Sequence, residues 1–271
     1  MTVASILTEL AAAFRDLLQT NDKMKLEDMP AKVYDVYGKG SNDGYNGGLA
    51  EGIEEGKQAE YDRFWDNFQQ NGNRKEYRYA FGGDGWTKET FKPKYDLKPT
   101  SAQQMFAGFS TVYEKTSIAE CLEQAGVILD TSNSTNCQQM FYACRSVEIP
   151  NINLGSATNA SNLFYDALYL KKVEITVPES CPLTVYSNWF GGCKELEDLT
   201  VNGVLKYSLD LSKSTKLTKD SIDSVLYALA NNPTSVQTLT LSATAVNAVY
   251  TPEQWEILVA TFAPNWSLVL A

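Results

Sequence analysis

Residues 101–112 read SAQQMFAGFSTV and residues 136–147 read NCQQMFYACRSV, so one pattern occurs twice in a chain of 271 residues. In both copies a phenylalanine follows two glutamines and a methionine, and small or apolar residues then recur at every third position. The sets with this spacing are Phe106, Phe109 and Val112; Phe141, Cys144 and Val147; Phe164, Ala167, Leu170 and Val173; and Phe190, Cys193, Leu196 and Leu199. Their leading phenylalanines lie 35, 23 and 26 residues apart.

A repeat of roughly 20–30 residues predicts a solenoid. Each unit is too small to bury its own apolar side chains, so neighbouring units stack on one another. The repeated phenylalanine is then expected in the interior, at equivalent points of successive coils. Two of the units run into short alternating strands, at residues 173–177 and 199–201.

The last part of the chain has longer units. The apolar spacing predicts strands over residues 207–211, 236–241 and 266–270, and helices over residues 218–230 and 252–262. Short strands alternating with helices are typical of leucine-rich-repeat units. We therefore expect an α+β fold, in which residues 100–271 form an irregular solenoid of short parallel strands, with helices in the last units.

Before residue 100 the sequence predicts a helical region over residues 1–72 and an aromatic hairpin or extended connector over residues 73–99. A heptad seam consists of Val3, Leu7, Leu10, Phe14 and Leu17, and glycines recur at every fourth position as Gly44, Gly48, Gly52 and Gly56. A glycine inside a helix costs roughly 1 kcal/mol relative to alanine, so a helix with several must gain from close backbone approach. Both faces are expected to mediate self-association; the alternatives are packing within the chain and, for the glycines, a flexible tether.

The composition argues against several classes of function. A net charge of −10 disfavours a nucleic-acid-binding surface. The first residues lack the basic segment and cleavage site of a secretory signal, and no apolar run is long enough for membrane insertion. The five cysteines include no CxxC pair, which indicates reduced thiols and folding in a cytoplasm.

Catalytic motifs are missing from the sequence. Without any histidine, the Ser-His-Asp and Cys-His arrangements are excluded, and no glycine-rich phosphate-binding motif is present. Carboxylates that could form the pair needed by a glycosidase are Glu51, Glu54 and Glu55, and Glu195, Glu197 and Asp198, but we expect them on solvated faces. The sequence therefore predicts a protein without catalytic residues, metal or cofactor, and a carbohydrate-active enzyme is a further alternative.

Aromatic side chains offer the candidate ligand-binding surface. Flat rings beside asparagine and serine suit the faces of sugars. The candidates in the repeat region are Tyr142, Tyr165, Tyr169, Tyr186 and Trp189. The alternative is that some of them pack in the core or between repeats.

The repeat units resemble a known class. Their FxxCxxL(V)xxL pattern, with spacers rich in threonine, serine and asparagine, is similar to the leucine-rich repeats of BspA-like proteins. The stretch that begins LTKDSIDSVLYALANN and runs to the end of the chain resembles the end of such proteins encoded by phages of Gram-positive and gut bacteria. LLQTNDKMKLEDMPAKV and EGKQAEYDRFWDNFQQNGN resemble their N-terminal halves.

This resemblance implies a non-enzymatic virion structural protein of a phage, in the tail or another host-facing appendage, assembled in the cytoplasm of the bacterial host. The implied partners are other virion proteins, further copies of the chain (with a trimer favoured), and a glycan or protein of the host surface. A BspA-like adhesin of the bacterial cell surface is the alternative, and the missing secretory signal counts against it.

Overall fold

The computed structural model describes residues 80–83, 86, 91–109, 116–231, 233 and 235–271. Contacts divide the chain into two compact units, Met1–Phe64 and Trp65–Ala271, and all described residues belong to the second unit. The predicted helical region over residues 1–72, with its heptad seam and its glycines, lies outside the described residues. Within the described part, the fold is mixed α+β with small parallel sheets, as the sequence predicts.

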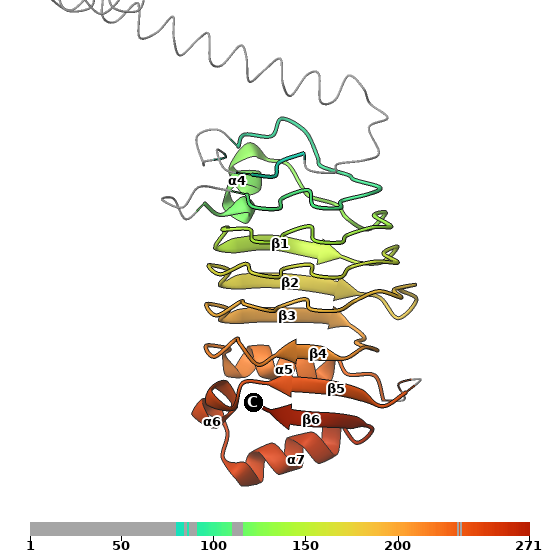
Figure 1. Ribbon diagram of the computed structural model, residues 1–271, viewed down its shortest axis with the longest axis vertical. Helices are drawn as coiled ribbons and strands as arrows, with labels where there is room; N and C mark the ends of the chain where they lie inside the picture. The colour runs from blue at the N-terminus through green and yellow to red at the C-terminus, as the bar shows by residue number, and fades with distance from the viewer. Residues whose placement is uncertain (1–79, 84–85, 87–90, 110–115, 232, 234) are drawn as a thin grey trace, which may run out of the picture. The chain divides into compact units, whose positions relative to one another are not determined.

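One sheet is formed by β1 (Glu148–Asn153), β2 (Lys172–Val177) and β3 (Asp198–Gly203), which are parallel and lie in this order (Figure 1). Buried side chains alternate with more exposed ones along β2, because one face of the strand packs on the core. The strands predicted at residues 173–177 and 199–201 are therefore confirmed. The sequence pattern does not indicate β1.

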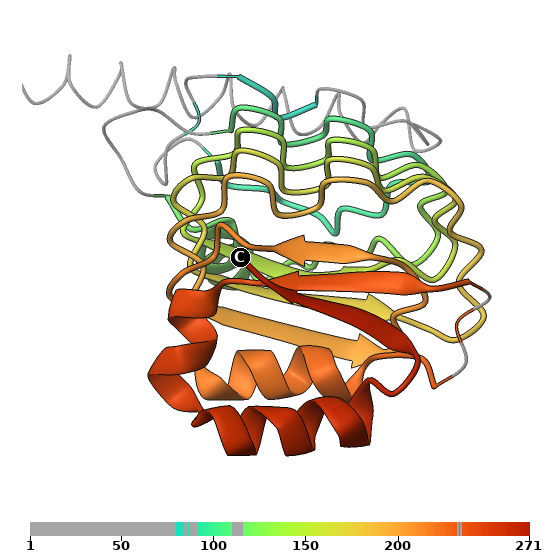
Figure 2. The same ribbon diagram turned by 60° about the horizontal axis from the view of Figure 1, so that its bottom comes forward.

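Four short stretches of chain lie across the core from the sheet and are named here the outer segments. They are residues 101–109, 136–144, 159–167 and 185–193. Neighbouring outer segments run parallel, because single bridges join Ser101 to Asn136, Asn136 to Asn159, and Asn159 to Val185. Alternate backbone N–H groups of each segment donate to carbonyls of the next. Each outer segment thus belongs to one rung of a stack, which Figures 1 and 2 show from two sides.

Phenylalanine rings form a column through the core of this stack. The rings of Phe106, Phe141, Phe164 and Phe190 follow one another with centroids 5.2 to 5.5 Å apart. Each of these side chains is at most 1% exposed. The prediction that the repeated phenylalanines are buried at equivalent positions is confirmed, because the backbone pairing of the outer segments places their rings directly above one another.

The column extends further toward the N-terminus than the sequence indicates. Phe81 lies 5.3 Å from Phe106, and the backbone N–H groups of Phe81 and Gly83 donate to carbonyls of the first outer segment. Residues 80–83 therefore pair as an outer segment does, although the sequence places them in a connector over residues 73–99. The backbone pairing of the stack thus includes residues before 100. Phe81 escapes the pattern because two glycines follow it, with no apolar residue three positions later.

Helices cover both edges of the first sheet. On one side is α4 (Ile118–Ala125), where Ser146 accepts from the N–H of Ile118 and donates to the carbonyl of Glu148 at the start of β1. On the other side is α5 (Lys219–Tyr227), which packs against β3. The helix N-termini are capped by the side chains of Ser117 and Thr218.

The contact between α5 and β3 is made by serines. The N–H of Leu199 donates to Ser221 Oγ at 2.9 Å, and the N–H of Val201 donates to Ser224 Oγ at 2.8 Å. Ser221 Oγ also donates to the carbonyl of Glu197 at 2.9 Å. These side chains satisfy backbone groups that a further strand would otherwise pair, and so the helix ends the sheet.

A second parallel sheet consists of β4 (Leu209–Leu211), β5 (Gln237–Leu241) and β6 (Trp266–Leu270). Ser214, three residues after β4, donates from its Oγ to the carbonyl of Cys193 in the last outer segment at 3.0 Å. Two further helices, α6 (Ala243–Val249) and α7 (Pro252–Phe262), connect β5 to β6. In Figure 2, α5 and α7 lie side by side on one side of this sheet. The strands and helices predicted after residue 200 are confirmed, and α6 is the addition.

Candidate ligand-binding surface

The side chains of the outer segments that do not enter the core form one surface, named here the outer surface. Its equivalent positions are Gln103, Gln138, Ser161 and Ser187; Gln104, Gln139, Asn162 and Asn188; Ala107, Tyr142, Tyr165 and Gly191; and Gly108, Ala143, Asp166 and Gly192. Most of them are half-buried, since the neighbouring rungs lie close to one another. Asp166 is the one charged side chain among them, in a chain of which 21% of residues are charged.

The backbone of the outer surface turns at the same two points in each rung. Gln104, Gln139, Asn162 and Asn188 all have φ between 54° and 55°. The second point has Gly108, Ala143, Asp166 and Gly192, with φ from 50° to 89°. Non-glycine residues adopt this left-handed region at a cost, and the surrounding structure must hold them there. The recurrence of the same angles therefore indicates that packing fixes the shape of the outer surface.

Amide side chains form rows on this surface. Gln104 Nε2 donates to Gln139 Oε1 at 2.9 Å, and Gln103 Nε2 donates to Gln138 Oε1 at 3.3 Å. A primary amide offers two donor hydrogens and an acceptor oxygen, so each of these contacts uses only part of the capacity of the pair. The doubled QQ of the sequence is thus both a mark of the repeat and a polar surface feature.

Tyr142 and Tyr165 lie next to these amides and stack on one another. Their ring centroids are 5.8 Å apart, with 6° between the ring planes. The ring of Tyr165 also packs against Gly191, where an added Cβ would lie 2.7 Å from a ring carbon. The equivalent residue on the other side of Tyr142 is Ala107, in the rung whose Gly108 N–H donates to the Tyr142 carbonyl. Tyr142 therefore ends the aromatic stack with one ring face toward a small residue.

The other predicted aromatic residues do not join this pair. Tyr186 stacks instead on Tyr207 at 4.1 Å, and the hydroxyl of Tyr207 donates to the carbonyl of Leu183. Tyr169 is half-buried in the loop before β2. The five candidates thus supply one adjacent pair, Tyr142 and Tyr165, and not a single cluster.

Trp189 is a core residue, which corrects its assignment to the binding surface. It is only 5% exposed, and it occupies the position of Met105, Met140 and Leu163 in the preceding rungs. Its Nε1 is buried without a hydrogen-bond partner. The sequence pattern also predicts that Trp189 is buried. Each repeated phenylalanine is preceded by one large apolar residue, and Trp189 is the residue at that position in the fourth outer segment.

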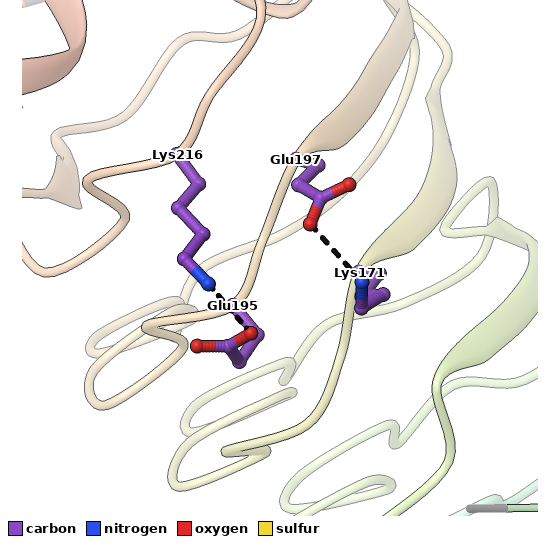
Figure 3. Close-up of polar contacts among 4 residues, drawn as sticks. All are labelled: Lys171, Glu195, Glu197 and Lys216. Carbon is purple, nitrogen blue, oxygen red and sulfur yellow. Dashed lines mark hydrogen bonds and ion pairs between the residues drawn. The ribbon is translucent and has the colours of Figure 1, made fainter.

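The carboxylates of residues 195–198 engage lysines of neighbouring rungs, as Figure 3 shows. Lys171 Nζ lies 3.2 Å from Glu197 Oε1, and Lys216 Nζ lies 2.8 Å from Glu195 Oε2. All four side chains are at least 36% exposed. Ion pairs between side chains this exposed add little to the stability of the fold. These carboxylates therefore act as links between rungs on a solvated edge.

The cysteine thiols are buried, and three of them are held strongly in the protonated form. All five cysteines are free and buried. Desolvation raises the pKa of Cys137, Cys144 and Cys193 to about 12, so their thiols stay protonated at neutral pH. A nucleophilic role would need the thiolate, which this environment disfavours.

None of the helices that the structure describes has the length and apolar character needed to cross a membrane. Among the described residues, no group of three acidic or cysteine side chains is placed to hold a metal ion.

No family model, curated protein or solved structure matches the chain.

Proposed function

We propose that this chain is a non-enzymatic virion structural protein of a phage, a component of the tail or of another host-facing appendage. In this proposal the stacked rungs are an irregular leucine-rich-repeat solenoid of the BspA-like class. The support comes from the resemblance of the sequence, from the parallel rungs and from the column of phenylalanines. The outer surface is the part that contacts the host.

The observation that carries the binding role is the Tyr142–Tyr165 stack, set among amide side chains on a surface with a single charged group. Half-buried rings beside uncharged hydrogen-bonding groups, as Tyr142 and Tyr165 are, are typical of recognition surfaces. Backbone hydrogen bonds hold this surface rigid before any ligand arrives, which lowers the entropy lost on binding.

The helical region over residues 1–72 is proposed to join the protein to copies of itself and to other virion proteins. Light scattering of the full chain tests the self-association. Gly48→Leu and Gly52→Leu should reduce the mass to that of one chain, 30.1 kDa, by blocking close helix approach. If the wild-type chain is already monomeric at high concentration, the proposed self-association is wrong. Residues 1–72 would then be proposed only to dock onto a different virion protein.

The test of the proposed function is mass spectrometry of purified particles of a phage that encodes the chain. We expect peptides of the protein at a stoichiometry typical of a structural component. Its absence from the particles would overturn the proposal. Recovery from the envelope fraction of uninfected cells would favour the adhesin.

A further inference from the structure

We propose that the outer surface around Tyr142 binds a neutral glycan, made of hexose or N-acetylhexosamine units. The inference rests on the proposed function, because it names the ligand class of the same binding surface. The aromatic stack, the amide rows and the charge of the surface each point to this class.

The aromatic stack offers one ring face for a sugar. One face of Tyr142 lies on Tyr165, which is itself held against Gly191. The opposite face is directed toward the rung of Ala107, whose methyl group is far smaller than a ring. The C–H face of a pyranose is apolar and flat, so it can stack on this ring as an aromatic side chain would.

The amides beside the ring suit hydroxyl groups. A sugar hydroxyl both donates and accepts, and so does a primary amide. The contacts between Gln104 and Gln139, and between Gln103 and Gln138, orient these amides while leaving hydrogen-bonding capacity on each pair. Hydrogen-bonded neighbouring rungs lie about 4.8 Å apart, so the amides of successive rungs repeat at roughly the length of one pyranose unit in an extended chain.

The charge of the outer surface disfavours acidic ligands. It has no lysine or arginine, and its one charged group is the carboxylate of Asp166. Phosphate, sulfate and uronate groups would be repelled by that carboxylate, and the nearest cations in the sequence, Arg145 and Lys194, lie just beyond the ends of the outer segments. Teichoic acids and acidic capsules are thereby disfavoured, and a neutral polysaccharide is the ligand that fits.

Calorimetric titration of the full chain with cellohexaose, maltohexaose, chitohexaose and, as the acidic probe, polygalacturonate tests the inference. We expect at least one neutral oligosaccharide to bind. Tyr142→Ala should weaken that binding by about tenfold or more, since it removes the ring contact. Ala107→Tyr should weaken it similarly by placing a ring against the Tyr142 face that is directed toward Ala107. The next two rungs already have tyrosine at this position. The control is Tyr227→Ala, on α5 with 65% exposure, and it should bind as wild type does.

Three results would overturn the inference: no neutral oligosaccharide binds at millimolar concentration, only polygalacturonate binds, or both variants at the site bind as wild type does. Thermal melts identify any variant that is unfolded, and Ala107→Tyr provides the test if Tyr142→Ala fails to fold. If the protein is found in virions but binds no glycan, this inference alone is wrong and the proposed function is unaffected.

Discussion

Phe141 and Phe164 have no exposed surface, and each ring stacks between two other rings. Alanine at either position leaves a cavity that cannot close, because backbone hydrogen bonds fix the distance between the rungs. We expect each variant to lower the free energy of unfolding by about 3–5 kcal/mol in urea denaturation. Lys213→Ala, at an exposed position, should stay within about 0.5 kcal/mol of wild type. A loss below about 1 kcal/mol for Phe141→Ala would contradict the column as a stabilising feature.

Two glycines separate the effect of backbone conformation from that of close contact. Gly126 has φ 66°, and a Cβ added there would have nothing within 4 Å. Gly203 has φ 109°, and its Cβ would lie 2.0 Å from the carbonyl oxygen of Val177 in β2. Gly126→Ala should therefore cost about 1–2 kcal/mol through φ alone, and Gly203→Ala should cost clearly more, because the strand must also shift. Equal losses in denaturation would argue against the close pairing at the end of β3.

At the level of the elements, the seal between β3 and α5 depends on Ser221. This side chain is 3% exposed and serves two backbone groups, the N–H of Leu199 and the carbonyl of Glu197. Ser221→Ala should lower the free energy of unfolding by about 1–3 kcal/mol, because it leaves buried polar groups without partners. Hydrogen exchange at the Leu199 amide should become faster as well. Ser180→Ala, at an exposed position before β3, is the control, and a similar loss there would remove the special role of Ser221.

The sequence predicts those elements whose own residues favour them. β2 reads KVEITV, with β-branched residues alternating with polar ones, and so its strand period is visible. β1 reads EIPNIN, in which a proline and two asparagines disfavour a strand, and pairing with β2 overrides that preference. α6 has only seven residues, including threonine, valine and asparagine, so its helix depends on contacts that the sequence does not reveal.

The candidate site was predictable only in part, for a similar reason. Tyr142 and Tyr165 could be proposed from their type and position, but their stacking depends on the parallel pairing of rungs 23 residues apart. The amide rows were detectable, because Gln104, Gln139 and Asn162 recur at the spacing of the phenylalanines. Composition alone could not place Trp189 in the core, since tryptophan is common both in cores and at binding surfaces.

At the scale of the whole stack, stability should depend on the number of neighbouring rungs. β2 lies between two strands, and Val173, Ile175 and Val177 are 1% exposed. At the C-terminal end, no residue of α7 is fully buried, and Val269 and Leu270 of β6 are 41% and 39% exposed. A unit with a neighbour on one side only is stabilised by one interface instead of two.

We therefore expect hydrogen exchange to be faster in α7 and β6 than in β2. The ratio of the two rates should fall as denaturant is added, because global unfolding then exposes all the amides together. Mass spectrometry of peptides from the intact chain measures both regions in one sample. Equal protection throughout would mean that the stack unfolds as a single cooperative unit.

The buried cysteines allow differences in local opening between parts of the stack to be measured by thiol labelling. Cys137 and Cys144 lie in the outer segment 136–144 and Cys193 lies in the outer segment 185–193, and burial holds each thiol protonated and away from reagents. An alkylating reagent can modify each one only while the surrounding rung is open. The labelling rate of each cysteine is therefore a local clock, and a comparison of the clocks reveals the order in which the molecule comes apart without any engineered probe.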